Sequence, residues 1–214
     1  MHSPMKPAQP LRVLGVAAHP DDLELGCGGT LLKMHRAGHE IYVVVMSFGE
    51  AAGEATTRRK EQELVAKFYG AKKVYWMGHE DTRVKVDRAS IDAMDKILHE
   101  VHPDIVFVHH DADTHQDHRS TSKLVVSATR YTQNVLFYET STTTSFSPEV
   151  FVDIANFVED KCRLLRNHKS QWKTLRVGDL TVVDCARSMA LFRGVQGRVK
   201  AAEGFVPLRL LLNV

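Results

Sequence analysis

Uninterrupted runs of apolar, often β-branched residues alternate along the chain with longer segments in which apolar positions recur every three or four residues. The runs predict strands buried on both faces, and the longer segments predict helices. The predicted strands cover residues 11–17, 41–47, 73–77, 104–108 and 135–138. The predicted helices cover residues 28–38, 56–69, 87–101 and 117–130. This alternation predicts a three-layer, Rossmann-like α/β fold with a mostly parallel sheet and helices on both faces.

The pattern weakens after Glu139, where the sequence predicts a loop rich in serine and threonine, a strand, two helices and an edge strand. These elements cover residues 140–147, 150–154, 156–167, 181–193 and 208–212. Among the earlier helices, we expect Thr56 to cap the start of one, and Gly38 and Gly70 to end two of them.

Length and composition indicate an ordinary globular chain of 214 residues, 43% hydrophobic and 25% charged. We expect a flexible N-terminal tail over residues 1–10 and a single domain over residues 11–214. The net charge of +2 indicates no nucleic-acid partner, and no apolar run is long enough for membrane insertion. Cys27, Cys162 and Cys185 form no CxxC pair, so we expect neither disulfides nor a thiolate zinc site, and a cytoplasmic location.

Two polar clusters stand directly after predicted strands. Ala18-His19-Pro20-Asp21-Asp22 follows the first strand, and His115-Gln116-Asp117-His118 comes shortly after the fourth. In open α/β sheets, ligands bind outside the carboxyl ends of the strands. We therefore expect the two clusters to meet at one edge of the sheet, beside the loops at residues 47–55 and 78–83.

The two clusters contain the ligand types of a catalytic zinc site. An imidazole and a carboxylate from the first cluster, with His118 from the second, make a His/Asp/His set that leaves one position open for water. Carboxylates crowded in a partly buried turn also repel each other unless a cation or hydrogen-bond donors compensate, and a divalent metal is the simplest compensation. Adjacent residues of a tight turn do not easily both bind one ion. One of Asp21 and Asp22 therefore binds the metal while the other acts as a base, and the spacing leaves open which.

His115 lies three residues before His118, just outside the predicted helix. A protonated imidazole there would stabilise an oxyanion and protonate a leaving amine, and Asp117 would either hold that imidazole or cap the helix. In the alternative interpretation these residues have no metal to bind. The two aspartates of the first cluster are then turn and cap residues, and His19 is a hydrogen-bonded histidine of the core. Two clusters at matching strand ends favour the metal site.

These motifs resemble those of a known family. The segment from Ala18 to Asp22, continued by Glu24-Leu25-Gly26-Cys27-Gly28-Gly29-Thr30, resembles the signature of the LmbE-like (PIG-L) N-acetylglucosamine deacetylases. The segment His115–His118 resembles the second motif of that family. Weaker similarity extends over Thr57-Arg58-Arg59, His168-Lys169-Ser170-Gln171 and Glu203-Gly204-Phe205. The resemblance implies a zinc enzyme that hydrolyses the N-acyl group of an amino sugar.

The resemblance also implies roles for single residues. Asp21 is implied to be the general base, and His115 to stabilise the tetrahedral intermediate and serve the leaving amine, with Asp117 as its partner. Arg59, or Arg58 in its place, and Asp81 are implied to contact the substrate. The implied zinc ligands are His19, Asp22 and His118.

We therefore expect a cytoplasmic enzyme that uses zinc, or another divalent transition metal, to release acetate from a small N-acetylglucosamine-type substrate or conjugate. One alternative is an amidase of the same chemistry that cleaves thiol–sugar conjugates or other N-acyl compounds. Another is a nucleotide-binding module, which the run Gly26-Cys27-Gly28-Gly29 supports only weakly because it lacks the G-x-G-x-x-G spacing. Relatives often form trimers or hexamers, so a homo-oligomer is expected.

Overall fold

One seven-stranded sheet organises the part of the chain that the computed structural model describes, residues 9–173 and 177–211. Its strands are β1 (Arg12–Ala17), β2 (Glu40–Ser47), β3 (Ala71–His79), β4 (Ile105–His109), β5 (Val135–Tyr138), β6 (Val150–Asp153) and β7 (Ala202–Arg209). The helices are α1 (Asp22–Arg36), α2 (Ala55–Phe68), α3 (Arg88–Val101), α4 (Gln116–Ala128), α5 (Val158–Asn167) and α6 (Val182–Gly197). Most of the expected N-terminal tail, residues 1–8, lies outside the described residues.

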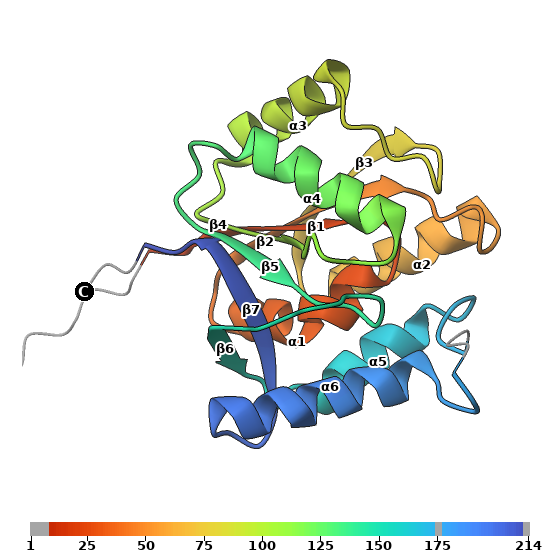
Figure 1. Ribbon diagram of the computed structural model, residues 1–214, viewed down its shortest axis with the longest axis vertical. Coiled ribbons are helices and arrows are strands. Elements are labelled where there is room, and N and C mark those ends of the chain that lie inside the picture. The colour runs from red at the N-terminus through yellow and green to blue at the C-terminus, as the bar shows by residue number, and fades with distance from the viewer. Residues whose placement is uncertain (1–8, 174–176, 212–214) are drawn as a thin grey trace, which may run out of the picture.

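The strand order is β3-β2-β1-β4-β5-β7-β6. Strands β1 to β5 pair in parallel, whereas β7 pairs antiparallel with both β5 and β6. Helices α3 and α4 cover one face of the sheet, and α1 and α2 cover the other (Figure 1). On that second face α6 packs against β6 and β7, and α5 packs against α1, α2 and α6. The predicted three-layer α/β fold with a mostly parallel sheet is therefore confirmed.

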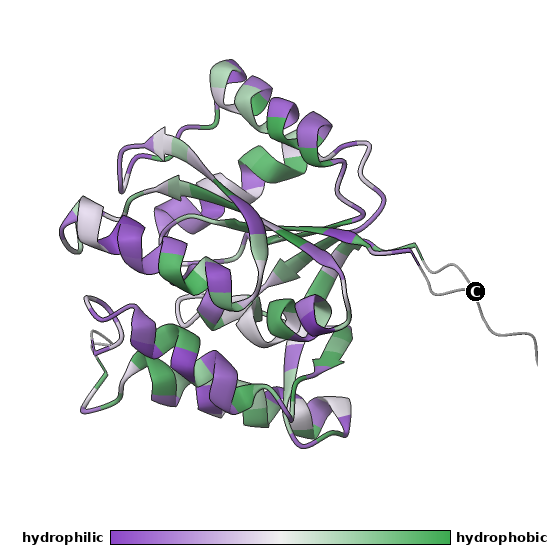
Figure 2. Cartoon of the chain, turned by 180° about the vertical axis from the view of Figure 1, so that it is seen from behind, coloured by the Kyte–Doolittle hydropathy of each residue, from purple (hydrophilic) through white to green (hydrophobic). Residues whose placement is uncertain are grey.

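The central strands are apolar throughout because both of their faces are buried. In β1, Val13 and Ala17 pack on the side of α1, while Leu14 and Val16 pack on the side of α3 and α4. Figure 2 shows the central strands mostly green, between helices that alternate between green and purple. None of the helices in the described part of the chain is long and apolar enough to cross a bilayer.

The last strand differs from the sequence-based expectation. We expected an edge strand over residues 208–212, but β7 begins at Ala202 and lies inside the sheet, between β5 and β6. Residues 212–214 lie outside the described part of the chain. Glu203, Gly204 and Pro207 interrupt the apolar pattern of β7, and these residue types are depleted in strands, so periodicity does not reveal it.

Three helices begin earlier than the sequence predicted, α1 by six residues and α2 and α4 by one residue each. Helix α1 starts at Asp22 and bends at Cys27, whose φ of −138° and ψ of 18° are not helical. Helix α2 is capped by the Glu54 carboxylate, which accepts the backbone N–H groups of Thr56 and Thr57. The expected cap at Thr56 is therefore wrong. Glutamate is outside the group of residues preferred at this position, which is why the rule missed it.

A buried ion pair completes the hydrogen bonding of the bent helix α1. Glu203, on β7, accepts the backbone N–H groups of Gly29 and Thr30 at 2.9 and 2.6 Å. Lys161, on α5, donates to the Leu25 carbonyl at 2.7 Å and to Glu203 at 2.6 Å. The bend leaves these helical groups without partners in the helix, so the pair satisfies donors and an acceptor that are buried.

We expect Glu203→Ala to destabilise the fold by about 3–5 kcal/mol, because it leaves the Lys161 charge buried and unpaired. Urea denaturation followed by circular dichroism measures the change. Glu159→Gln, which breaks the exposed pair with Arg187, is the matched control and should alter stability little. Equal midpoints for the two variants would show that the buried pair contributes nothing.

Candidate active site

A cavity of about 650 Å³ opens at the carboxyl edge of the parallel strands. Loops that follow β1, β2, β3, β4 and β5 all contribute to it, so the expected meeting of the two polar clusters is confirmed. Among the residues lining this cavity are His19, Asp21, Asp22, Arg58, Asp81, His115, His118, Thr140 and Thr142.

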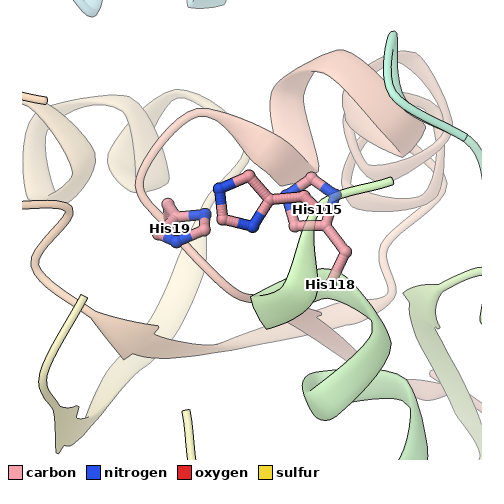
Figure 3. A group of neighbouring side chains, drawn as sticks. All are labelled: His19, His115 and His118. Carbon is pink, nitrogen blue, oxygen red and sulfur yellow. The ribbon is translucent and has the colours of Figure 1, made fainter. Parts of the chain in front are cut away.

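Three imidazoles lie side by side in the cavity (Figure 3). The ring of His115 lies 4.8 Å from that of His19 and 4.7 Å from that of His118, measured between centroids. A nitrogen of each ring lies within 4.8 Å of one on each of the others, so the three could share a metal ion. Asp22 and His109 make a second such group with His118. The expected ligand set of His19, Asp22 and His118 draws on both groups.

The Asp22 carboxylate is buried among these imidazoles. One oxygen lies 3.3 Å from Nδ1 of His19 and 3.2 Å from Nε2 of His109, and the other lies 3.4 Å from Nε2 of His118. Burial alone would raise the pKa of Asp22, but His118 and His109 hold it well below its usual value. Asp22 is therefore ionised and faces the two histidines expected to be its fellow ligands.

The outward nitrogens of both histidines are held by carboxylates. Nε2 of His19 lies 3.0 Å from Asp81 and 3.1 Å from Asp117, and Nδ1 of His118 lies 3.1 Å from Asp113. Metal-binding histidines characteristically contact a carboxylate through the nitrogen that faces away from the metal. The inward nitrogens, Nδ1 of His19 and Nε2 of His118, are thereby left to face Asp22.

The electrostatics of the site favour a bound cation. Burial would lower the pKa of His118, but Asp22 and Asp113 raise it to about 9. The pKa of His19 is likewise raised well above its usual value, against burial, by its three carboxylate neighbours. A divalent metal supplies this positive charge in place of the protons, so the donor set fits such an ion.

Asp117 has a different partner from the one expected. We expected its carboxylate to orient His115, but it contacts His19 and accepts the N–H groups of Thr82 and Val84 at 2.7 and 3.2 Å. His115 caps α4 instead, since its Nδ1 accepts the backbone N–H of Asp117. That contact requires Nδ1 to be unprotonated, so Nε2 carries the proton. Burial and the neighbouring His118 lower the pKa of His115.

Asp81 also supports His19. It lines the cavity, as expected, but both carboxylate oxygens are occupied: one faces His19, and the other accepts the backbone N–H of Ala51 at 2.9 Å. Burial would raise the pKa of Asp81, but His19 and the backbone donors lower it to about 2. Asp81 therefore lies behind His19 and holds its imidazole, whereas the resemblance implied contact with the substrate.

Arg58, and not Arg59, faces the site. The Arg58 guanidinium is buried and donates to the carbonyls of Gly49 and Pro20 at 2.7 and 2.9 Å. Arg59 points outward, pairs with Glu63 on the helix surface and lies over the Phe48 and Trp76 rings. The preference for Arg59 was wrong, because adjacent helical positions face about 100° apart and the sequence did not fix the rotation of α2.

Asp21 takes an unusual backbone conformation for a residue at the start of a helix. Its φ of 91° and ψ of −19° are left-handed, and its side chain makes no hydrogen bond to the end of α1. The carboxylate lines the cavity instead. Burial raises the pKa of Asp21 to about 6, although Arg58 and His168 partly offset the effect. A carboxylate with this pKa is suited to accept a proton near neutral pH.

The sequence analysis missed Asp113. Its carboxylate contacts His118, accepts hydroxyl hydrogen bonds from Thr140 and Thr143, and accepts the backbone N–H of His115 at 2.8 Å. Asp113 thus fixes both histidines of the second cluster and ties them to the loop after β5. The sequence could have indicated Asp113, because it lies two residues before His115 in a loop already assigned to the site.

Comparisons with known proteins show the family to which the chain belongs. Residues 14–129 match the PIG-L family, GlcNAc-PI de-N-acetylase. The chain is 34% identical to an uncharacterized deacetylase, YaiS, of Escherichia coli (strain K12), over 74% of this chain and 90% of that one. The chain therefore belongs to the PIG-L (LmbE-like) deacetylase family, which consists of metal-dependent hydrolases.

Two solved structures share the whole fold. The conserved protein TT1542 from Thermus thermophilus superposes with a TM-score of 0.84 at 27% identity, covering 95% of this chain and 97% of that one. An N,N'-diacetylchitobiose deacetylase from Pyrococcus horikoshii superposes with a TM-score of 0.81 at 28% identity, covering 95% and 86%. The alignments extend over the later elements, so the similarity includes the region beyond the family match.

We expect Arg58→Met to lower the free energy of unfolding by about 1–3 kcal/mol, because it leaves buried carbonyls of Gly49 and Pro20 without a donor. Arg59→Met removes a half-exposed side chain of the same kind and should change stability little. Urea denaturation of both variants tests whether Arg58, and not Arg59, is the buried arginine. A larger loss for Arg59→Met would contradict it.

Proposed function

We propose that this protein is a zinc-dependent hydrolase that removes the N-acetyl group from an N-acetylglucosamine-type amino sugar or its conjugate and releases acetate. One observation carries the proposal. Asp22 lies between the inward nitrogens of His19 and His118, while the Asp21 carboxylate lines the same cavity without capping the helix. Metal ligands and a base are thus available side by side, as deacetylation requires.

His19, Asp22 and His118 are the residues that would hold the metal. Two imidazoles and one carboxylate make the ligand set of a catalytic zinc site with an open position. When bound, zinc acts as a Lewis acid toward the acyl carbonyl and lowers the pKa of water. The carboxylates of Asp81, Asp117 and Asp113 would keep the two imidazoles in orientation.

Side chains of the protein carry out the proton transfers and stabilise the charge that develops on the substrate. Asp21 accepts a proton from the attacking water at its carboxylate, while the water oxygen bonds to the amide carbon. His115 donates the N–H of Nε2 to the oxygen that gains negative charge. When the carbon–nitrogen bond breaks, the leaving amine receives a proton from Asp21, or from His115, which Asp21 then reprotonates. The balance is one water and one amide consumed, and one acetate and one protonated amine formed, because the second proton of the water passes from the new carboxyl group to the amine.

Relatives of the chain support the proposed substrate class. Both the family description and the Pyrococcus horikoshii enzyme name N-acetylated glucosamine compounds. An amidase of thiol–sugar conjugates or other N-acyl compounds would use the same catalytic groups, and acetate or other acid release from a substrate panel distinguishes the two. The expected single domain over residues 11–214, the homo-oligomer and the cytoplasmic location stay predictions.

We expect His118→Ala to lose both bound zinc and acetate release, because it removes an inward-facing nitrogen of the ligand set. Elemental analysis and acetate release from N-acetylated sugars, including N,N'-diacetylchitobiose, measure the two losses. His99→Ala changes an exposed histidine of α3 and should retain both. Full zinc content and full activity in His118→Ala would refute the metal assignment.

We expect Asp21→Asn to retain zinc but to lower kcat by on the order of 10²–10⁴, because the amide cannot accept the proton. Asp22→Asn should lose zinc as well, since it weakens a ligand. Zinc content and kcat of the two neighbouring variants therefore separate the base from the ligand. If Asp21→Asn retained wild-type kcat, another group would have to be the base.

A further inference from the structure

Asp21 has a strained backbone that α1 alone does not account for. A left-handed φ of 91° is unfavourable for any residue with a Cβ, and such a conformation persists only where the surroundings enforce it. At the start of a helix an aspartate ordinarily turns its carboxylate toward the free N–H groups, which Asp21 does not do. Something outside α1 must therefore hold this residue.

Both hydrogen-bonding groups of one peptide unit are held by side chains of α2. The peptide between Pro20 and Asp21 comprises the Pro20 carbonyl and the Asp21 N–H. Arg58 Nη2 donates to that carbonyl at 2.9 Å, and Gln62 Oε1 accepts that N–H at 3.1 Å. Arg58 and Gln62 are four residues apart, so they stand on the same side of the helix, one turn from each other.

Each of the two side chains is itself fixed. The amide nitrogen of Gln62 donates to Glu24 at 2.9 Å, which determines where its oxygen points, and also lies 3.2 Å from the Tyr69 hydroxyl. Arg58 also donates to the Gly49 carbonyl at 2.7 Å. All four side chains, of Arg58, Gln62, Glu24 and Tyr69, are almost fully buried. Rotation of the peptide would break two buried hydrogen bonds at once.

We propose that Arg58 and Gln62 clamp the Pro20–Asp21 peptide and thereby hold the Asp21 carboxylate in the cavity, away from the end of α1. They are positioning residues, and the inference rests on the proposed role of Asp21 as the base. Released from the clamp, Asp21 would relax to a negative φ, and its carboxylate would be free to cap the helix.

Gln62→Met tests the clamp, because it keeps the volume of the side chain and removes the acceptor for the Asp21 N–H. Tyr69→Phe is the matched variant, since it removes hydrogen bonds from the same buried cluster but leaves the contact between Gln62 and Asp21. Lys60→Met makes the same replacement at an exposed position of α2. The zinc-loaded variants are compared by thermal unfolding, zinc content, kcat and KM.

We expect Gln62→Met to lower kcat tenfold or more, with KM within about twofold and zinc content unchanged, because the base is displaced while the metal ligands stay. Tyr69→Phe should lower the unfolding temperature but keep kcat within about threefold, and Lys60→Met should resemble the wild type. Wild-type kcat in Gln62→Met, an equal loss in Tyr69→Phe, or loss of zinc in Gln62→Met would each overturn the proposal.

Hydrogen exchange of the Asp21 amide separates this proposal from the proposed function. In Gln62→Met we expect that amide to exchange about tenfold faster or more, whereas in Lys60→Met it should exchange as in the wild type. If wild-type protein released no acid from any N-acyl substrate, the proposed function would fail while faster exchange still supported the clamp. Unchanged exchange would refute the clamp whatever the activity.

Discussion

The rest of the site depends on the burial of one carboxylate, that of Asp22, among imidazoles. A charge so far from water is costly unless opposite charge or hydrogen-bond donors surround it. The fold meets this requirement because β1 and β4 are neighbours in the sheet, so His19, after β1, and His118, beyond β4, reach the same carboxylate. The parallel order of the strands is thus what turns two distant sequence motifs into one site.

A second layer of carboxylates makes the arrangement rigid. Asp81, Asp117 and Asp113 each hold an imidazole nitrogen of His19 or His118, and each in turn accepts backbone N–H groups from a loop at the same edge of the sheet. The loops after β2, β3 and β4 are therefore connected through hydrogen bonds to the two histidines. The same carboxylates leave the site rich in negative charge, which a divalent cation would balance in place of two protons.

The parts of this structure that the sequence predicted are those governed by local patterns. The parallel strands β1, β2, β4 and β5 appear in the sequence as apolar runs because both of their faces are buried. The two clusters follow β1 and β4 because ligands bind at that edge of the sheet. What failed depends on contacts between distant segments. Strand β7 forms, despite Glu203 and Pro207, because it pairs with a strand on each side. The rotation of α2 about its axis determines that Arg58, and not Arg59, faces the site. Asp117 contacts His19 because the loop that contains Thr82 donates a backbone N–H to its carboxylate.

The turn that carries Asp21 shows why residues far along the chain bear on the first motif. A strained residue persists only if rigid structure lies on both sides of it. On one side the peptide is held by α2, through Arg58 and Gln62. On the other side α1 begins at once, and its bend is completed by Lys161 and Glu203. Without that pair, α1 would lack partners for its buried backbone groups and could straighten or shift, and the strain at Asp21 would be relieved by movement of the helix. The late motif around Glu203 therefore contacts the first motif directly, through the backbone N–H groups of Gly29 and Thr30.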